Sequence, residues 1–105
     1  MSIGMVPIEI KIGSMVEGVL PVYIKGGQAF IDGFRSEVID IRTIKPGANP
    51  VIYYRVDLTD HNRGKVWVAE YRIRAFMFGG IEMDHSKFDP QIIEDEDRKI
   101  LKKRP

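Results

Sequence analysis

The stretch VIYYRVDLTDHNRGKVWVAEYRIR, from Val51 to Arg74, decides the fold of this chain. In its first arm, apolar residues occupy every second position, which is the period of a half-buried β-strand. These residues are Ile52, Tyr54, Val56 and Leu58. A polar run from Thr59 to Gly64 follows, and its last glycine suits the positive φ that tight hairpin turns need. The stretch therefore predicts a β-hairpin with one face in a core.

The second arm of this hairpin changes its phase. Val66 and Val68 point inward on one phase, whereas Tyr71 and Ile73 point inward on the opposite one. A regular strand would place these two pairs on opposite faces of the sheet. A single turn of 3₁₀ helix around Ala69–Glu70 would let all four residues face one core, so we expect a break there.

Further extended segments flank the hairpin. Alternation over residues 8–12 predicts an N-terminal strand. Val19–Lys25 is a second extended piece, and Pro21 favours an edge position for it. Residues 28–44 form a long extended run, in which Gly33 predicts a bend or a bulge.

A short surface helix is predicted near the C-terminal end of the sequence. Asp89 is suited to the N-cap and Pro90 to the first helical position. Four acids at residues 94–97 are followed by bases, an order that complements the helix dipole. The apolar stripe of this helix is narrow. It consists of Ile92, Ile93, Ile100 and Leu101.

The 105 residues fit a single domain with three zones. Residues 1–24 form an N-terminal extended segment, residues 25–78 a barrel, and residues 81–105 a loop with the helix. The central zone resembles SH3-like small barrels, because VWVAEYRI is similar to their closing strand, 3₁₀ turn and final strand. RSEVIDIR followed by YYRVDLTDHNRGKVWV is similar in layout to Tudor and chromo-barrel domains. The resemblance implies a mainly β fold with an SH3-like barrel, at least one extra N-terminal strand and a C-terminal helix.

Bulk composition excludes several classes of protein. Hydrophobic residues make up 44% of the chain and charged residues 30%, which argues against disorder of the whole chain. The net charge is +1, and a protein coating nucleic acid usually shows a clear basic excess. No cysteine is present, which removes disulfides, thiolate nucleophiles and Cys-based metal sites. No basic signal-type leader and no long apolar run stands in the sequence, so we expect a soluble, cytoplasmic protein without membrane contact.

Aromatic and basic residues on the outward phase of the hairpin are the candidate ligand-binding residues. Aromatic rings can hold a cation or stack on bases, and arginines can grip an anionic backbone. Arg55, Arg72 and Arg74 are expected to share an outward phase. The full candidate set is Tyr53, Arg55, Trp67, Arg72 and Arg74.

A purely structural role is the alternative for these residues. Tyr54 and Tyr71 would then belong to the core, Trp67 would cover one sheet face, and Phe34 is a further aromatic of either kind. Alternating charges are commonly a solvated sheet face whose exposed pairs contribute little. Between Lys25 and Phe76 the chain carries nine basic and six acidic residues, so the predicted barrel is mildly basic.

Catalytic, metal and cofactor sites are not indicated. His85 stands near Glu82, Asp84 and Asp89 without a recognised metal-ligand spacing, and His61 lies in a predicted turn. No serine has a nucleophile context and no glycine run has phosphate-binding spacing. We therefore expect no catalytic residue, no metal and no cofactor.

The sequence thus predicts a small non-catalytic binding or adaptor module. It would act through the aromatic and basic barrel face or through an oligomeric surface, with a protein partner or a second copy of itself. An apolar edge formed by Ile8, Ile10 and Ile12 with Met5 and Met15 favours self-association. Two alternatives stay open: an accessory protein that binds nucleic acid, and a structural subunit of an assembly.

Overall fold

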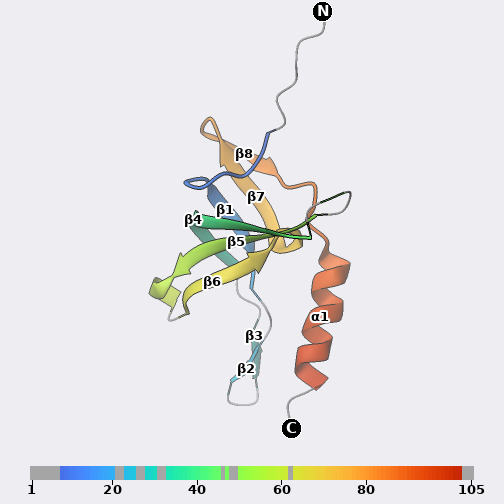
Figure 1. Cartoon of the computed structure of the whole chain (residues 1–105). Helices are drawn as coiled ribbons and strands as arrows, with labels where there is room; N and C mark the ends of the chain where they lie inside the picture. The colour runs from blue at the N-terminus through green and yellow to red at the C-terminus, as the bar shows by residue number, and fades with distance from the viewer. Residues whose placement is uncertain are drawn as a thin grey trace, which may run out of the picture.

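A computed structural model shows a mainly β chain with one helix at its C-terminal end (Figure 1). The structure describes residues 8–20, 23–25, 28–30, 33–45, 47, 50–61 and 63–102. No helix within these ranges is long and apolar enough to cross a membrane.

Six strands form one antiparallel sheet, and two short strands form a separate hairpin. The sheet has the order β6-β5-β4-β1-β7-β8. Its strands are β1 (Met15–Val19), β4 (Gly33–Ile44), β5 (Val51–Leu58), β6 (Gly64–Ala69), β7 (Ile73–Phe78) and β8 (Ile81–Asp84). The separate hairpin consists of β2 (Tyr23–Lys25) and β3 (Gln28–Phe30). In the described part of the chain β6 and β8 are edges, so the sheet is open and the expected SH3-like barrel is not confirmed.

The predicted hairpin and the predicted 3₁₀ break are both confirmed. β5 and β6 pair antiparallel around a 3₁₀ turn at Thr59–His61 (η1), and Gly64 has a φ of 68°. A second 3₁₀ turn, η2, covers Glu70–Arg72 and separates β6 from β7. Val68 and Ile73 on either side are both buried, as expected, and Val66 packs against the core, whereas Tyr71 does not join it.

The prediction of an N-terminal strand over residues 8–12 was wrong in the position of the strand and in its place in the sheet. No strand runs over residues 8–12, of which only Ile10 is buried. Gly13, with a φ of 95°, turns the chain and donates its N–H to the carbonyl of Val38 at 2.8 Å. β1 begins two residues later and lies between β4 and β7, in the middle of the sheet. The first 24 residues therefore supply a central strand, and the sheet extends across both borders of the predicted barrel zone.

The long run before the hairpin is divided differently from the prediction. β4 begins at Gly33, and its register irregularity lies between Val38 and Asp40. Pro21, which favoured an edge position, lies outside the described residues, and the neighbouring strand β2 pairs only with β3 among those that are described.

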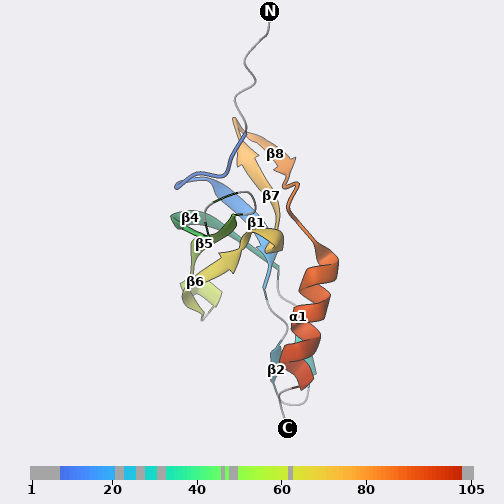
Figure 2. The same ribbon diagram turned by 45° about the vertical axis from the view of Figure 1, so that its right-hand side comes forward.

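Helix α1 (Pro90–Lys102) begins where the capping pattern predicts. The carboxylate of Asp89 accepts hydrogen bonds from the N–H groups of Gln91 at 3.0 Å and Ile92 at 3.2 Å. The four acids, however, lie beyond the first turn, which contains no acidic residue. Their place in the middle of the helix brings Glu96 and Asp97 opposite η2. The helix lies beside η2 and the β2–β3 hairpin and does not cover the sheet (Figure 2).

One apolar core lies on the inner face of the sheet. Gly18 of β1 is essential to its packing, because a Cβ there would lie 2.5 Å from the carbonyl oxygen of Arg72 and 2.9 Å from the ring of Phe34. The buried cluster consists of Ile10, Val16, Leu20, Phe34, Val38, Tyr54, Val56, Leu58, Val68, Ile73 and Phe76. Phe34 and Tyr54 are thereby core residues.

Candidate functional site

The outer side of β4, β5 and β6 carries an aromatic–basic face, formed by Arg42, Tyr53, Arg55 and Trp67. Arg42 is the register partner of Tyr53, and Arg55 is the register partner of Trp67. Side chains alternate between the two faces of a strand, so the burial of Tyr54 and Val56 leaves Tyr53 and Arg55 on the outside. The sheet register therefore brings these four residues together.

Trp67 is the centre of the aromatic–basic face. The guanidinium carbon of Arg42 lies 4.8 Å from the centre of its ring, and that of Arg55 lies 5.6 Å from it. Both distances are within the range of a cation–π attraction between a guanidinium group and an indole. The indole thus holds two cations in place on the surface without neutralising either of them.

No carboxylate of the described chain forms an ion pair with Arg42 or Arg55. Nε of Arg55 is buried and has no hydrogen-bond partner among the residues that the structure describes. The acids on neighbouring strands are engaged locally. Asp57 accepts hydrogen bonds from the hydroxyl and the N–H of Thr59, which lower the pKa of its carboxyl, and Asp40 accepts one from the N–H of Ile41 at 2.8 Å. The face is therefore a site where two guanidinium groups form no ion pair with a described carboxylate, although Asp40 is the register partner of Arg55.

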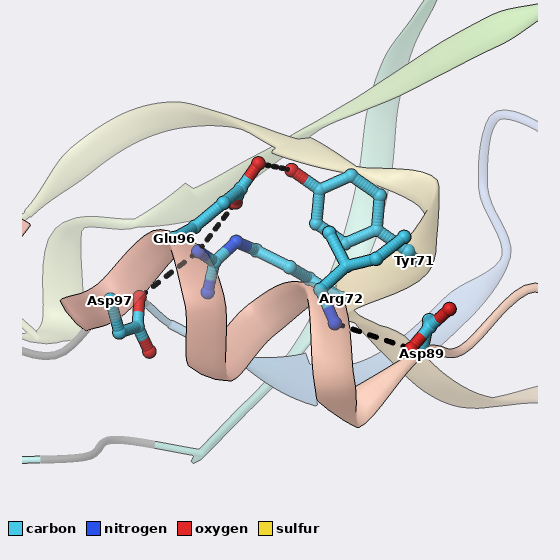
Figure 3. A network of polar contacts seen from close by, with 6 residues as sticks. Tyr71, Arg72, Asp89, Glu96 and Asp97 are labelled. Carbon is cyan, nitrogen blue, oxygen red and sulfur yellow. Dashed lines mark hydrogen bonds and ion pairs between the residues drawn. The ribbon is translucent and has the colours of Figure 1, made fainter. Parts of the chain in front are cut away.

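Arg72 does not belong to this face, and the expectation that it shares the outward phase of Arg55 was wrong. The η2 turn directs it towards helix α1, where it is only 5% exposed (Figure 3). Its guanidinium group contacts Glu96 at 3.0 Å and Asp97 at 3.1 Å. It therefore connects the sheet to the helix.

Tyr71 completes this connection. Its hydroxyl donates a hydrogen bond to the carboxylate of Glu96, which also accepts from Arg72 (Figure 3). Burial and the neighbouring Glu96 raise the pKa of the Tyr71 phenol, so it stays a donor. We call Tyr71, Arg72, Glu96 and Asp97 the helix clamp. The expectation that Tyr71 points into the core was wrong, because η2 extends through Arg72 and turns Tyr71 towards the helix.

Arg74 lies on β7, which β1 and β4 separate from β5. It is exposed and forms an ion pair with Glu17 of β1. The predicted set therefore divides. Tyr53, Arg55 and Trp67 lie together, and Arg74 lies elsewhere. Arg72 borders a hollow beside Tyr53 and Trp67, but its guanidinium group is held by the helix. Arg42 was missed. Its alternation with Ile41 could have placed it on the outer phase, but its register against the hairpin could not be read from the sequence.

A second exposed surface lies at the other end of the sheet. Phe78 is 51% exposed and Ile81 is 68% exposed at the tip of the β7–β8 hairpin. Ile12 and Met15 are also exposed, and the pairing of Val16 with Phe76 brings β1 beside that hairpin. Among the described residues, no cluster of histidine and acidic side chains is arranged to hold a metal ion.

Comparison of the chain with profiles of known families, with curated proteins and with solved structures gave no match. The aromatic–basic face therefore has to be interpreted from its own geometry.

Proposed function

We propose that this protein is a small non-catalytic binding module that holds an acidic, extended segment of a partner protein on its aromatic–basic face. The observation that carries this proposal is the placement of two guanidinium groups beside Trp67 with no carboxylate partner in the described chain. Hydrogen bonds between guanidinium groups and carboxylates are among the stronger polar contacts in proteins. A partner carboxylate would supply the anion that the fold itself does not.

Edge strand β6 supports an extended partner. β6 carries Trp67 and has no neighbour on its outer side among the described strands. Its outward backbone groups, which no described strand pairs, can accept an added strand, and alternate side chains of such a strand would face the same side as Trp67. In this mode the backbone pairing supplies affinity, and Arg42 and Arg55 supply the preference for acids.

A protein partner fits the charge of the chain better than nucleic acid does. The net charge is +1, and the outer face also contains acidic Asp40 and Asp57. Sequence-independent binding to nucleic acid needs several phosphates neutralised at once. The experiment therefore has to distinguish binding of an acidic peptide from binding of nucleic acid.

An SH3-like barrel stays part of this proposal. The order hairpin, 3₁₀ turn and further strand over β5, β6, η2 and β7 supports the resemblance. The open edges at β6 and β8 are where the sheet departs from a closed barrel. The strand that a partner adds at β6 would extend the same sheet.

The proposal is tested by amide-correlation NMR with three probes. The first is the blocked peptide acetyl-Glu-Val-Glu-Thr-Glu-Val-amide, the second is its counterpart with glutamine in place of glutamate, and the third is a ten-nucleotide oligothymidylate. We expect saturable shifts at Arg42, Arg55 and Trp67 with the acidic peptide, and at least tenfold weaker binding of the glutamine peptide. Shifts confined to other surfaces would contradict the proposal. Stronger binding of the oligonucleotide at the same face, with a steep salt dependence, would replace it by a nucleic-acid function.

A structural role in an assembly is the second candidate. It is favoured by the exposed apolar pair Phe78 and Ile81, which are register partners at edge strand β8. Contiguous exposed apolar side chains next to a free sheet edge commonly mark an interface between chains. Sedimentation over a hundredfold range of concentration tests it. A mass that rises with concentration, and that Phe78→Ser abolishes, supports self-association; a constant monomer mass excludes it over that range.

A further inference from the structure

A hollow of about 450 Å³ opens on the inner side of the sheet, away from the aromatic–basic face. Its apolar wall comes from β4, β5 and β8 through Ile41, Ile52 and Met83, which pack against the core. Its polar wall contains Tyr54, Glu70 and His85 among other groups. Ligand-binding sites are commonly concave, mostly apolar and provided with a few convergent polar groups, and this volume lies in their usual range.

One buried polar atom beside the hollow lacks a hydrogen-bond partner among the described residues. Nε2 of His85 is buried and has no hydrogen-bond partner in the described part of the chain. It lies 3.7 Å from the carboxylate of Glu70, which is too long for a hydrogen bond between them. Burial, and then Lys87, lower the pKa of the imidazole, so it is neutral at pH 7. A carboxylate only accepts hydrogen bonds, and a neutral imidazole nitrogen accepts when the proton is on its other nitrogen.

The fold holds these groups in place. The ring of His85 packs edge-on against Phe76 with the ring centres 5.9 Å apart, and the backbone N–H of His85 donates to the carbonyl of Arg74 at 2.9 Å. Glu70 is the first residue of η2 and is therefore fixed by the 3₁₀ turn. The carboxylate of Glu70 is the acceptor that a ligand in the hollow can reach, because Nε2 of His85 is covered.

The charge of the hollow favours a cation. Its ionisable lining consists of the acids Glu9, Glu70 and Asp84, the base Lys87, and His85 and Tyr54. Burial, Glu70 and Glu9 together raise the pKa of Tyr54 to about 12, so the negative potential of the two acids reaches the inner wall. Burial raises the pKa of Glu70, and a bound cation would offset that cost of desolvation.

We propose that the hollow binds a small organic amine, with its ammonium group on the carboxylate of Glu70 and its apolar body against Ile41, Ile52 and Met83. A primary ammonium carries three donors and one positive charge, which matches the carboxylate of Glu70 and a net negative lining. This site is separate from the aromatic–basic face, so either can fail without the other.

The test uses 2-phenylethylamine and two controls of similar size. 2-Phenylethanol keeps the apolar body without the charge, and 3-phenylpropanoate reverses the charge. In amide-correlation NMR we expect the amine to cause saturable shifts at Glu70, Met83 and His85. The alcohol should bind at least tenfold more weakly, and the acid should cause no shift there. Equal binding of the amine and the alcohol, or shifts that never saturate, would overturn the proposal.

Variants assign the amine to the named groups. Glu70→Gln should weaken amine binding at least tenfold, whereas Glu82→Gln, which removes the same charge from an exposed position outside the hollow, should leave it unchanged. Lys87→Gln should strengthen binding, because it removes the cation of the lining. Should Glu70→Gln lose the spectrum of a folded protein, the Lys87 variant still decides: unchanged or weaker amine binding there contradicts the proposal.

Discussion

The helix clamp and the aromatic–basic face both place arginines beside an aromatic residue, yet the two sites treat the charge in opposite ways. In the clamp, Arg72 is buried and meets two carboxylates of α1. On the face, Arg55 and Arg42 lie beside Trp67 and meet no carboxylate of the described chain. The fold thus uses one arginine to join its parts and leaves the others available at its surface.

This difference shows that an arginine in an alternating sequence can be either a buried structural cation or an exposed binding residue. A buried cation must be paired, since its desolvation is costly, so Arg72 belongs to the stability of the protein. A surface cation held by an aromatic ring keeps its position at little cost and can meet an external anion. Changes to the clamp should therefore affect stability, and changes to the face should affect binding.

Replacement of Arg72 should have the largest effect on stability. Arg72→Met leaves Asp97, which is only 6% exposed, without its cation, and removing one partner of a buried pair costs about 3 to 5 kcal/mol. Urea unfolding measures the change. The double variant Arg72→Met/Asp97→Leu should recover most of the loss, because it leaves no buried charge unpaired. A loss below about 1 kcal/mol in the single variant would show that the pair is not buried in solution.

Gly18→Ala should have the next largest effect, through the backbone that carries the clamp. The new Cβ would collide with the carbonyl oxygen of Arg72 and with the ring of Phe34, at 2.5 Å and 2.9 Å. Such overpacking costs about 1 to 3 kcal/mol. Thermal unfolding checks it, with Gly79→Ala as the control, since a Cβ there meets no atom within 4 Å but bears the strain of a φ of 55°. Equal losses in both variants would attribute the effect to glycine itself.

Asp89→Ala should have a smaller effect on the helix side of the clamp. It removes the acceptor for the N–H groups of Gln91 and Ile92, and loss of an N-cap costs about 1 kcal/mol. The helical circular dichroism signal and the urea midpoint measure it. Asp89→Asn retains a capping side chain and should stay near the wild type. If alanine and asparagine behave alike, the cap does not hold the helix that presents Glu96 and Asp97.

The smallest expected effect is the dependence of stability on pH that His85 causes. The pKa of His85 is lowered by burial and then by Lys87, so below its usual value of 6.5 the unfolded chain binds a proton more readily than the folded one. Stability contributed by neutral His85 is therefore complete above pH 6.5 and declines as the pH falls below it. Glu70 acts in the opposite sense, because burial raises its pKa. His85→Gln should flatten the fall in thermal midpoint between pH 6.5 and 5; an unchanged slope would exclude His85 as its cause.

Local sequence patterns were sufficient to predict the secondary-structure elements but not which elements pack against each other. The 3₁₀ turn at η2 followed from the phase change between Val68 and Ile73, and the helix start followed from Asp89 and Pro90. Each of these two signals is contained within a few consecutive residues. The role of Ile8 to Ile12 was misjudged because alternation alone does not exclude a turn at Gly13.

The residues of the candidate site that lie in one hairpin were predicted, and the residue from another strand was missed. Tyr53, Arg55 and Trp67 belong to one hairpin, so its register was enough to bring them together. Arg42 comes from β4, whose pairing with β5 includes an irregularity that no local pattern specifies. Arg72 has the phase of an exposed residue in a continuous strand, and only the acids of α1 reveal it as buried.

The most direct test of the central claim is a fluorescence titration of two arginine variants with the acidic peptide acetyl-Glu-Val-Glu-Thr-Glu-Val-amide. Trp67 is the only tryptophan of the chain, so its emission reports on the aromatic–basic face alone. Arg55→Gln should weaken peptide binding at least tenfold and leave the urea midpoint unchanged, because a charge-assisted hydrogen bond contributes about 1.5 to 3 kcal/mol. Arg98→Gln, an exposed change on α1, should bind like the wild type. Equal affinity of the two variants, or a loss of stability in Arg55→Gln as large as that in Arg72→Met, would contradict the division between a clamp that holds the fold and a face that holds a partner.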